Sequence, residues 1–591
     1  MENVRIAIID TGISPNAECA NRILESYILN CEKDNYTLLP TKTEDHIGHG
    51  TAVASIIYSL NQKIEIVSIN ICKYNYEVEE CALIYALEYL YQKCDVDIIN
   101  ISAGITNISD NQGMKDICDK LNARGIIIIS AYDNNKAISY PAAYKSVIGI
   151  DVISDYDNKH DIYRVENSIV NILVPDVYYR TLWLNEKAII KGTSFAAAKI
   201  TGLISKKIHN LWKNEYRKIS KKNIIEAVTN KLITLPIKDE VPQPNFCIKK
   251  AIVFPLNKES RALLHYRNRL QFEIVGVYDA RMSINIHKNV LGEYIRSYNE
   301  IDWRSDFDTV IISCTDELYR LAKRDYYSEI LKMAQKYHKN IYSFEKSNAN
   351  ASNYFYPEIT KRMVPYENFK KLHKINIPIV GVYGTSSKQG KYTLQLELIY
   401  RLSTLGYNVG HIASEPSGYL FNSDFVFHFG YHSYVNLHPR ECISILNQMV
   451  WEIQEKRRDI LIAGCQSNTV HYDNCQIDDF AIYQNAFLLG TLPDFIILCV
   501  NPHDDIEYIE RTIRYINAID VGKVGALVIF PIQAIETITG ISYKLENVSK
   551  RKMQELQKYF GEIFKMPAFA LGEDEDMKQL CELIITFFSE E

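Results

Sequence analysis

Residues 191–198 read Lys-Gly-Thr-Ser-Phe-Ala-Ala-Ala and decide the fold of the first half of the chain. They follow a strand predicted at 186–190, turn at one glycine, and continue as small residues typical of a closely packed helix. Ser194 is therefore expected at a helix N-terminus, where backbone N–H groups favour negative charge. An oxyanion forming beside Ser194 would be stabilised there, although an ordinary helix-capping serine has the same local sequence.

Two more polar residues stand at the ends of apolar elements upstream. Asp10 ends the apolar strand predicted at 4–9, and His49 lies between two glycines at the start of a small-residue helix. A serine hydroxyl becomes a good nucleophile when an imidazole takes its proton and a carboxylate orients that imidazole. The chain order Asp, His, Ser is that of subtilisin. Residues 1–215 therefore resemble the subtilisin-like serine peptidases.

The resemblance assigns a role to each of these residues. It implies that Asp10 is the orienting carboxylate, His49 the general base and acid, and Ser194 the nucleophile. His46 lacks the flanking glycines and is expected on a surface loop. The resemblance further implies a subtilisin-like α/β domain with a parallel sheet, acting as a serine endopeptidase without a metal or cofactor.

The oxyanion donor is predicted in residues 125–135, which resemble the family strand that ends in Ala-Gly-Asn. Counting from Gly125 places Asn134 on the family asparagine, whose side-chain amide would donate to the oxyanion. Tyr132 and Asp133 replace the small residues that normally precede it. If the register slips by one, Asp133 occupies the hole instead, and an ionised carboxylate there would repel the oxyanion. An ordinary solvated turn is the alternative, because Asp-Asn-Asn is good turn chemistry.

Residues 97–104 resemble the family strand whose exposed edge pairs with the substrate backbone. By this resemblance Ser102, Ala103 and Gly104 bind substrate and form one wall of the pocket for the residue before the cleaved bond. A buried parallel strand without a substrate role has the same apolar pattern.

The bulk composition limits the classes of function. The chain has 591 residues, so about two to four domains are expected, and its net charge of −6 argues against a nucleic-acid partner. No apolar run approaches the roughly 20 residues of a membrane span. Thirteen cysteines without a CxxC pair predict reduced thiols and no metal site. Because the first strand begins at Val4, there is no room for a signal peptide, and a cytoplasmic location is expected.

Strands and helices alternate along the whole chain, which predicts α/β domains. Prolines at 236, 242 and 244 place a first boundary, giving a peptidase domain at 1–240. We expect a small Rossmann-like α/β domain at 249–372, without the GxGxxG dinucleotide fingerprint, and a P-loop α/β domain at 373–591.

Residues 384–393 read Gly-Thr-Ser-Ser-Lys-Gln-Gly-Lys-Tyr-Thr, between a predicted strand and a predicted helix. This placement favours a phosphate-binding loop, in which backbone N–H groups and a lysine contact phosphates. Five residues separate the glycines, and Tyr392 follows the lysine, so the sequence departs from the standard Walker A motif and resembles dethiobiotin-synthetase-like P-loop proteins. A strand-to-helix turn with a surface lysine is the alternative. The predicted nucleotide-binding residues are Gly384, Thr385, Gly390, Lys391 and Thr393.

The expected cofactor of this domain is ATP or GTP with Mg²⁺, which Thr393 would ligate. The strand predicted at 459–463 does not end in an acidic residue, so hydrolysis is left open. Glu415 is a candidate metal or substrate contact, with a solvated loop acid as the alternative.

Residues 249–591 are similar in overall pattern to a clostridial family associated with maturation of ribosomally made peptides. The first hypothesis is thus a serine endopeptidase that removes the leader of a precursor peptide, and other maturation enzymes are its expected partners. The second is an ATP- or GTP-dependent peptide-modifying enzyme whose N-terminal domain mainly binds the peptide.

Overall fold

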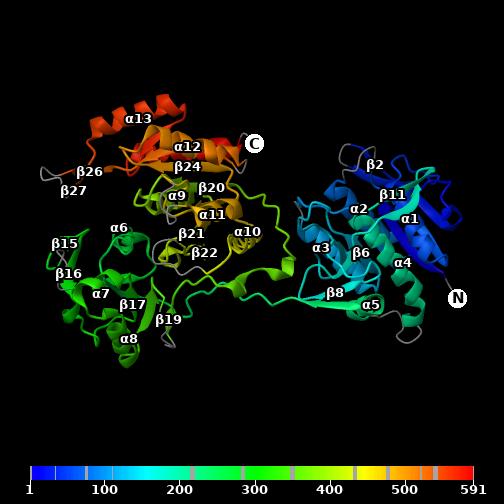
Figure 1. Ribbon diagram of the computed structural model, residues 1–591, viewed down its shortest axis with the longest axis horizontal. Helices are drawn as coiled ribbons and strands as arrows, with labels where there is room; N and C mark the ends of the chain where they lie inside the picture. The colour runs from blue at the N-terminus through cyan, green and yellow to red at the C-terminus, as the bar shows by residue number, and fades with distance from the viewer. Residues whose placement is uncertain are drawn as a thin grey trace. The chain divides into compact units, whose positions relative to one another are not determined.

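The computed structural model describes residues 3–32, 35–72, 78–108, 111–212, 220–280, 286–346, 353–429, 436–473, 480–519, 522–536 and 543–589. The chain divides into two compact units, drawn in Figure 1. The first contains residues 1–238 and 365–374, and the second contains residues 239–364 and 375–591.

The first unit is built on a sheet of order β12-β8-β9-β7-β6-β5-β1-β4-β2-β3, in which β7, β6, β5, β1 and β4 run parallel. Isoleucine-rich strands suit this position, because a parallel sheet is covered on both faces. The strands are β1 (Val4–Asp10), β2 (Ile23–Glu32), β3 (Asn35–Pro40), β4 (Ile64–Asn70), β5 (Ile98–Ile101), β6 (Ile127–Ala131), β7 (Val147–Ile153), β8 (Tyr163–Glu166), β9 (Ile172–Pro175) and β12 (Lys231–Thr234).

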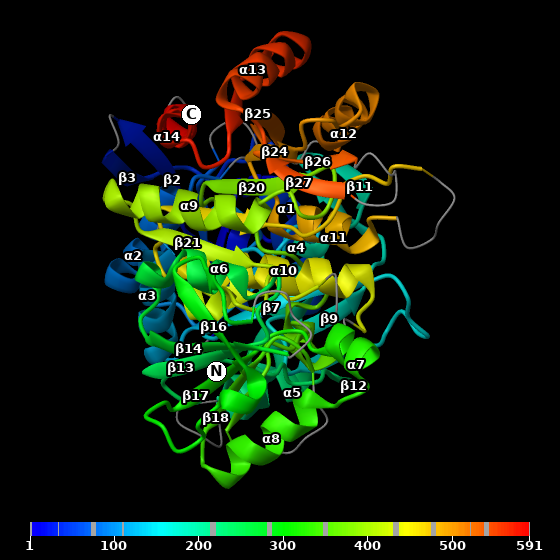
Figure 2. The same cartoon turned by 90° about the vertical axis from the view of Figure 1, so that its left-hand side faces the viewer.

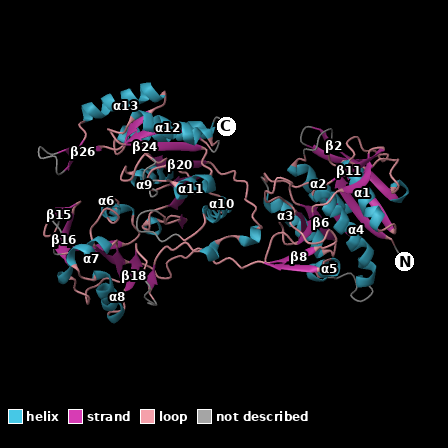
Figure 3. Cartoon of the chain, viewed as in Figure 1, coloured by secondary structure: helices cyan, strands magenta, loops and turns pink. Residues whose placement is uncertain are grey.

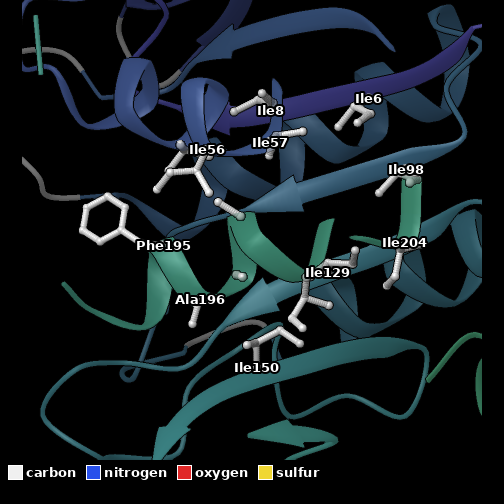
Figure 4. Close-up of a cluster of buried hydrophobic side chains, with 14 of the residues drawn as sticks. Ile6, Ile8, Ile56, Ile57, Ile98, Ile129, Ile150, Phe195, Ala196 and Ile204 are labelled. Carbon is white, nitrogen blue, oxygen red and sulfur yellow. The ribbon is translucent and has the colours of Figure 1, made fainter. Parts of the chain in front are cut away.

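Helices cover both faces of this sheet. They are α1 (His49–Leu60), α2 (Glu80–Lys93), α3 (Asn111–Ala123), α4 (Thr193–Trp212) and α5 (Lys221–Val228). The core between α1, α4 and the sheet contains Ile6 of β1, Ile57 of α1, Ile129 of β6 and Ala196 of α4 (Figure 4). The small side chains predicted after Ser194 are fully buried here, so their function in the fold is close packing of α4.

The strand predicted at 186–190 is confirmed as β11 (Glu186–Ile190), which pairs with β10 (Tyr179–Trp183) in a separate hairpin. The sequence of residues 221–231 predicts a helix that closes the first domain, but α5 ends at Val228 and Lys231 begins β12. The reason is a contact between distant segments: the backbone N–H groups of Asn230 and Lys231 both donate to the carbonyl of Ile162, which turns the chain into the sheet.

The second unit contains two seven-stranded sheets whose strands are mostly parallel, and helices pack on each of them, as Figure 3 shows. The Rossmann-like sheet has the order β15-β16-β14-β13-β17-β18-β19. Its elements are β13 (Lys250–Phe254), α6 (Arg261–His265), β14 (Glu273–Asp279), β15 (Asn289–Val290), β16 (Glu293–Ser297), β17 (Thr309–Ile312), α7 (Asp316–Ala322), α8 (Tyr326–Lys336), β18 (Asn340–Ser343) and β19 (Tyr354–Phe355). The sequence of residues 318–339 predicts one helical stretch, whereas the structure has two helices, α7 and α8, with a break at Lys323, whose backbone is left-handed.

The P-loop sheet has the order β22-β21-β23-β20-β24-β25-β28. Helix α9 contacts β20, β21 and β23 (Figure 2), and its apolar residues share a core with α14. The elements are β20 (Ile379–Gly384), α9 (Lys391–Thr404), β21 (Val409–Ala413), β22 (Phe425–Val426), α10 (Pro439–Glu455), β23 (Ile460–Gly464), α11 (Ile482–Thr491), β24 (Phe495–Val500), α12 (Ile506–Ala518), β25 (Lys523–Ile529), β26 (Ile532–Glu536), β27 (Tyr543–Asn547), α13 (Lys550–Phe564), β28 (Ala568–Ala570) and α14 (Asp574–Ser589). The predicted α/β fold class is confirmed in both units.

Within the described residues, no helix combines the length and apolarity needed to cross a bilayer.

Residues 365–374 form an insert into the first unit, although the sequence places them at the border of the second and third predicted domains. Lys371 in this insert is 2% exposed, and its ammonium lies 2.7 Å from a carboxylate oxygen of Asp151 in β7. The same ammonium lies 5.0 Å from the ring centroid of Tyr132. Tyr132, the unexpected large residue beside the predicted oxyanion donor, is itself buried, and it points toward this insert.

Backbone hydrogen bonds complete the attachment of the insert. The carbonyl of Leu372 accepts from the N–H of Ile138 at 3.1 Å, in the loop that follows Asn134. The carbonyl of Glu367 accepts from the N–H of Ile169 and the hydroxyl of Ser168. The peptidase unit is therefore completed by a segment that lies more than 100 residues beyond its last strand.

Replacement of Lys371 by methionine is expected to destabilise the first unit by about 3–5 kcal/mol, because it leaves the Asp151 carboxylate buried without its partner. Urea unfolding, followed by hydrogen exchange of peptides from β6 and β7, measures this change.

Lys370→Met is the matched control, since Lys370 is the adjacent lysine and is exposed. The double variant Asp151→Asn, Lys371→Met should recover part of the loss, because no uncompensated charge remains. Equal stability of the Lys370 and Lys371 variants would contradict a structural role for the buried pair.

Candidate functional site

The carboxyl ends of β1, β5 and β6 border a cavity of about 760 Å³ in the first unit. Asp10 is the last residue of β1, His49 the first of α1, and Ser194 the second of α4. All three line this cavity, together with Asn134, so residues far apart in the sequence are brought together. This is the edge of a parallel sheet at which α/β proteins bind ligands.

Asp10 and His49 form a buried hydrogen-bonded pair. The imidazole Nδ1 lies 2.8 Å from Oδ1 and 3.0 Å from Oδ2 of Asp10, which is 5% exposed. Burial alone would raise the carboxyl pKa, but the charge of His49 and hydrogen bonds from His49, Ser102 and the Thr11 backbone lower it overall. Burial opposes the His49 cation, but Asp10, with a smaller contribution from Asp45, raises its pKa. The pair thus favours the state in which both groups are charged.

The close approach of α1 to β1 requires a glycine after His49. A Cβ at Gly50 would lie 2.2 Å from the carbonyl oxygen of Gly12 and 3.1 Å from the Cβ of Asp10. Any side chain there would push the helix, and His49 with it, away from Asp10.

Asp45 also holds the start of α1, and the sequence reasoning missed it. Its buried carboxylate accepts hydrogen bonds from the backbone of Ile47, Gly48 and Thr51, and from the hydroxyls of Thr51 and Thr11. Asp45 lies four residues before α1, whose N-cap is Gly48, so the usual capping pattern does not indicate it. Asp45 orients the helix that presents His49 and is a positioning residue.

Ser194 follows a turn that only glycine adopts easily, since Gly192 has a φ of +144°. The Ser194 hydroxyl is buried and donates to the carbonyl of Ser102 at 3.1 Å. The next residue, Phe195, has its ring 5.1 Å from the His49 ring, and Trp183 meets that imidazole edge-on at 6.1 Å. Two aromatic rings therefore border the imidazole and limit its movement.

Asn134 and Asp133 have different surroundings. The side-chain oxygen of Asn134 accepts from the backbone N–H of Thr193 at 3.2 Å and from its hydroxyl at 3.1 Å. The Asp133 carboxylate instead accepts from the backbone N–H of Asn135 at 2.7 Å, which is an Asx turn. Asn134 is therefore the residue tied to the serine turn, and its amide N–H groups are directed by this contact.

Ser102, Ala103 and Gly104 also line the cavity. They follow β5, which lies between β1 and β6 in the middle of the sheet, so the expectation of an exposed strand edge is wrong for 98–101. The edge is covered because the neighbouring strands continue on both sides. Only the residues beyond the end of β5 are in a position to pair with a peptide.

The second unit has a cavity of about 980 Å³ at the carboxyl ends of β20 and β24. Residues 387–393 line it, so Gly390, Lys391 and Thr393 of the predicted loop face this space. Gly384 and Thr385, which are also predicted to bind the nucleotide, are not among its lining residues. The carbonyl of Gly384 accepts from Thr469, and the hydroxyl of Thr385 donates to Asp504, so both residues hold the backbone of the loop. Gly390 is the N-cap of α9, so the cavity lies at a helix N-terminus.

Lys391 and Asp504 hold the conformation of this loop. Lys391 is 6% exposed, and its ammonium donates to the carbonyl of Ser386 at 2.6 Å, while burial lowers its pKa. Asp504 accepts from the side chain of Gln389 at 3.1 Å. The sequence reasoning missed Asp504, which follows β24 by four residues, at the strand end where ligand contacts are expected.

The Rossmann-like domain supplies the opposite wall of the same cavity. Lys258, Arg261 and His265 line it, and the Tyr266 hydroxyl donates to the carbonyl of Thr393 at 3.4 Å. The cavity is therefore shared by both domains of the second unit.

Glu415 faces the shared cavity as well. Burial raises the pKa of its carboxyl to about 7, and the charge of Glu259 adds to the rise, while Lys391 and Lys258 oppose it. A carboxyl group that titrates near neutrality can hold or release a proton there. Among the described residues, this cavity included, no group of three or more His, Cys, Asp or Glu side chains is arranged to bind a metal ion.

A buried carboxylate–imidazole pair in one cavity with a serine at a helix start is the arrangement that serine peptidases share. The model of the Subtilase family matches residues 1–241, and a domain of unknown function, DUF1611_C, described as a P-loop domain, matches residues 368–580. Residues 1–241 therefore form a subtilase-like domain, and residues 368–580 form a P-loop domain.

Individual relatives are distant. Subtilisin DY of Bacillus licheniformis is 27% identical over 34% of this chain and 74% of its own length. Minor extracellular protease Epr of Bacillus subtilis is 26% identical over 39% of this chain, which spans only 36% of that protein. The crystal structure of a lanthipeptide protease is 16% identical, over 38% of this chain and 78% of that one, with a TM-score of 0.31.

The geometry predicts the titration of His49. The imidazole of His49 should titrate above its ordinary pKa of about 6.5. Asp10→Asn should lower this pKa, because the negative charge of Asp10 is the largest effect that raises it against burial. Histidine ring signals in an NMR pH titration measure this. Ser194→Ala is the control, since it leaves the Asp10–His49 pair in place.

The same pair fixes the pH dependence of stability. Asp10 contributes stability above its unfolded pKa, and this is lost as pH falls through its lowered folded pKa. The contribution of His49 to folding stability is fully present below its unfolded pKa, and it is lost as pH rises through its raised folded pKa. The stability difference between the wild type and Asp10→Asn should therefore be largest between about pH 4 and 6.5. A pH-independent difference would contradict this.

Proposed function

We propose that the chain is a serine endopeptidase that uses Asp10, His49 and Ser194 as its catalytic triad. The observation that carries the proposal is the Asp10–His49 hydrogen bond in one cavity with Ser194. His49 would take the proton of the Ser194 hydroxyl as that oxygen attacks a peptide carbonyl, and would then give it to the leaving amine. The imidazolium formed in between is stabilised by the Asp10 carboxylate, which stays ionised.

The tetrahedral intermediate needs donors to its oxyanion, and we assign that role to the side-chain amide of Asn134. The contact between its oxygen and Thr193 supports this, because it ties the amide to the turn that carries the nucleophile. The hydrogen bond that the Asp133 carboxylate accepts from the backbone N–H of Asn135 supports the same assignment, because it engages that carboxylate in an Asx turn. Backbone N–H groups at the start of α4 would add further stabilisation.

Substrate binding is assigned to residues 102–104, whose backbone extends beyond the sheet into the cavity. The Ser102 carbonyl, now an acceptor for Ser194, would be released when that hydroxyl turns to the substrate. We further propose that the substrate is a ribosomally made precursor peptide, cleaved to remove its leader in the cytoplasm. The resemblance of residues 249–591 to a peptide-maturation family supports this choice.

A fluorophosphonate probe tests the peptidase proposal. The wild type should label covalently and Ser194→Ala should not, as read by mass spectrometry of the intact chain. Asn134→Ala should label about 10²–10³-fold more slowly, because one oxyanion donor is lost. Asp133→Ala should label at nearly the wild-type rate. A folded wild-type chain that never labels would overturn the proposal.

A second function is favoured by the shared cavity of the second unit. We infer that this cavity binds ATP or GTP, with the start of α9 and Lys391 on the phosphates. The residues present fit this ligand, since the cavity combines a helix N-terminus with a buried lysine. Thr393 and Glu415 offer the oxygen ligands that Mg²⁺ prefers, and the bound ion would neutralise phosphate charge. This supports the alternative of a nucleotide-dependent peptide modification.

Lys391→Ala should weaken nucleotide binding at least tenfold, because it removes the proposed charge-assisted contact between the buried ammonium and phosphate. Isothermal titration with ATP and GTP, each with Mg²⁺, measures it. Lys388→Ala, in the same loop, is the control for a general loss of positive charge. Equal affinity in the wild type and in Lys391→Ala would contradict a phosphate-binding role.

A further inference from the structure

A second cavity in the peptidase unit, of about 530 Å³, lies away from the proposed catalytic residues. It is bordered by the end of α3, the starts of β6 and β7, and the start of α5. Asn134 follows the opposite end of β6, and the five residues of that strand span about 16 Å at 3.3 Å per residue. The cavity is therefore separate from the peptidase site, and neither proposed function uses it.

The charged residues that line this cavity, among those the structure describes, are all positive. It contains Arg124, Lys145 and Lys221, and among its described residues there is no aspartate or glutamate. None of these three cations forms an ion pair with a residue in the described part of the chain. The whole chain has a net charge of −6, so three unopposed cations in one hollow are a local feature.

Lys221 is held so that its ammonium faces this region. The ammonium donates to the carbonyl of Lys145 at 3.0 Å and to that of Val147. Because it is buried without an acidic partner, its pKa is lowered to about 8. Arg124 is held by a different contact: its guanidinium lies over the ring of Tyr91 and donates to the carbonyl of that residue. Both cations are thus placed before any ligand arrives.

Ser146 supplies an independent indication of a ligand. It lines the cavity and is 7% exposed, yet its hydroxyl has no hydrogen-bond partner. A buried hydroxyl without a partner costs about 1–3 kcal/mol, so such groups are rare in folded proteins. An acceptor bound in the cavity would satisfy this donor.

Apart from Asn122 and Ser220, the rest of the lining is apolar. Ile126, Ile128, Ile148 and Ile224 contribute buried side chains, which suits the carbon part of a ligand. The volume is in the range of ordinary small-molecule sites. Three cations without an acid match a doubly charged group better than a single carboxylate.

We propose that this cavity is a binding site for a small organic phosphate, whose phosphate group contacts Lys221, Arg124 and the Ser146 hydroxyl. The isoleucines contact the carbon part of the ligand. The ligand therefore binds the peptidase unit at the end of the sheet opposite its catalytic residues.

Isothermal titration of the full chain tests the proposal, with inorganic phosphate, ribose 5-phosphate and acetate as probes. The titrations use a Lys391→Ala background, so that phosphate at the P-loop does not contribute and failure of the nucleotide proposal is distinguishable. Phosphate should bind, ribose 5-phosphate should bind more tightly, and acetate should bind at least tenfold more weakly. Acetate binding as tight as phosphate, or no phosphate binding, would overturn the proposal.

Two variants locate the site. Ser146→Ala should weaken phosphate binding about tenfold, which is the loss of one hydrogen bond to a charged group, and Lys221→Met should abolish it. Ser130→Ala is the matched control, because Ser130 is also buried without a hydrogen-bond partner but does not line the cavity. Ser146→Ala removes no protein contact, so its fold and its fluorophosphonate labelling should be preserved. Equal phosphate affinity in all three variants would also overturn the proposal.

Discussion

Asp10 is 5% exposed, and a carboxylate so deeply buried stays ionised only when other groups replace the water it has lost. In this chain the replacement comes from His49, Ser102 and the Thr11 backbone. These groups belong to three different elements, so the arrangement of the sheet and α1 has to hold them together. Gly50, Asp45 and the isoleucine core all serve that requirement, since each fixes α1 against β1.

The position of the nucleophile follows from the same requirement. Ser194 lies at the start of α4, and the buried alanines of that helix pack it against α1 and the sheet. A larger side chain at Ala196 or Ala197 would move the helix start relative to His49. The small-residue pattern after Ser194 is thus a condition for the geometry of the site.

Local sequence was sufficient for the main elements. The strand ending at Asp10, the helix starting at His49 and the helix starting at the serine turn all have strong short-range signals, and the structure has them where they are predicted. Tyr132 could not be understood in this way. From sequence it is a departure from a family pattern, whereas in the fold it is a buried ring beside Lys371, which lies 239 positions away in the chain.

Asp504 and the covered edge of β5 were missed for the same physical reason. The role of Asp504 depends on contact with Thr385 and Gln389, and the burial of β5 depends on which strands become its neighbours. The spacing of residues within one segment indicates neither the contacts of Asp504 nor the neighbours of β5. Pairings between strands and between distant loops are the part of a site that a single sequence describes least.

The insert of residues 365–374 has a consequence for how such a fusion can arise and change. The boundary between the two halves of the gene does not coincide with the boundary between the two folded bodies. An exchange of one half for another by recombination near codon 240 would separate Asp151 from Lys371 and leave the peptidase half incomplete. The two halves are therefore expected to be inherited together, as one evolutionary unit.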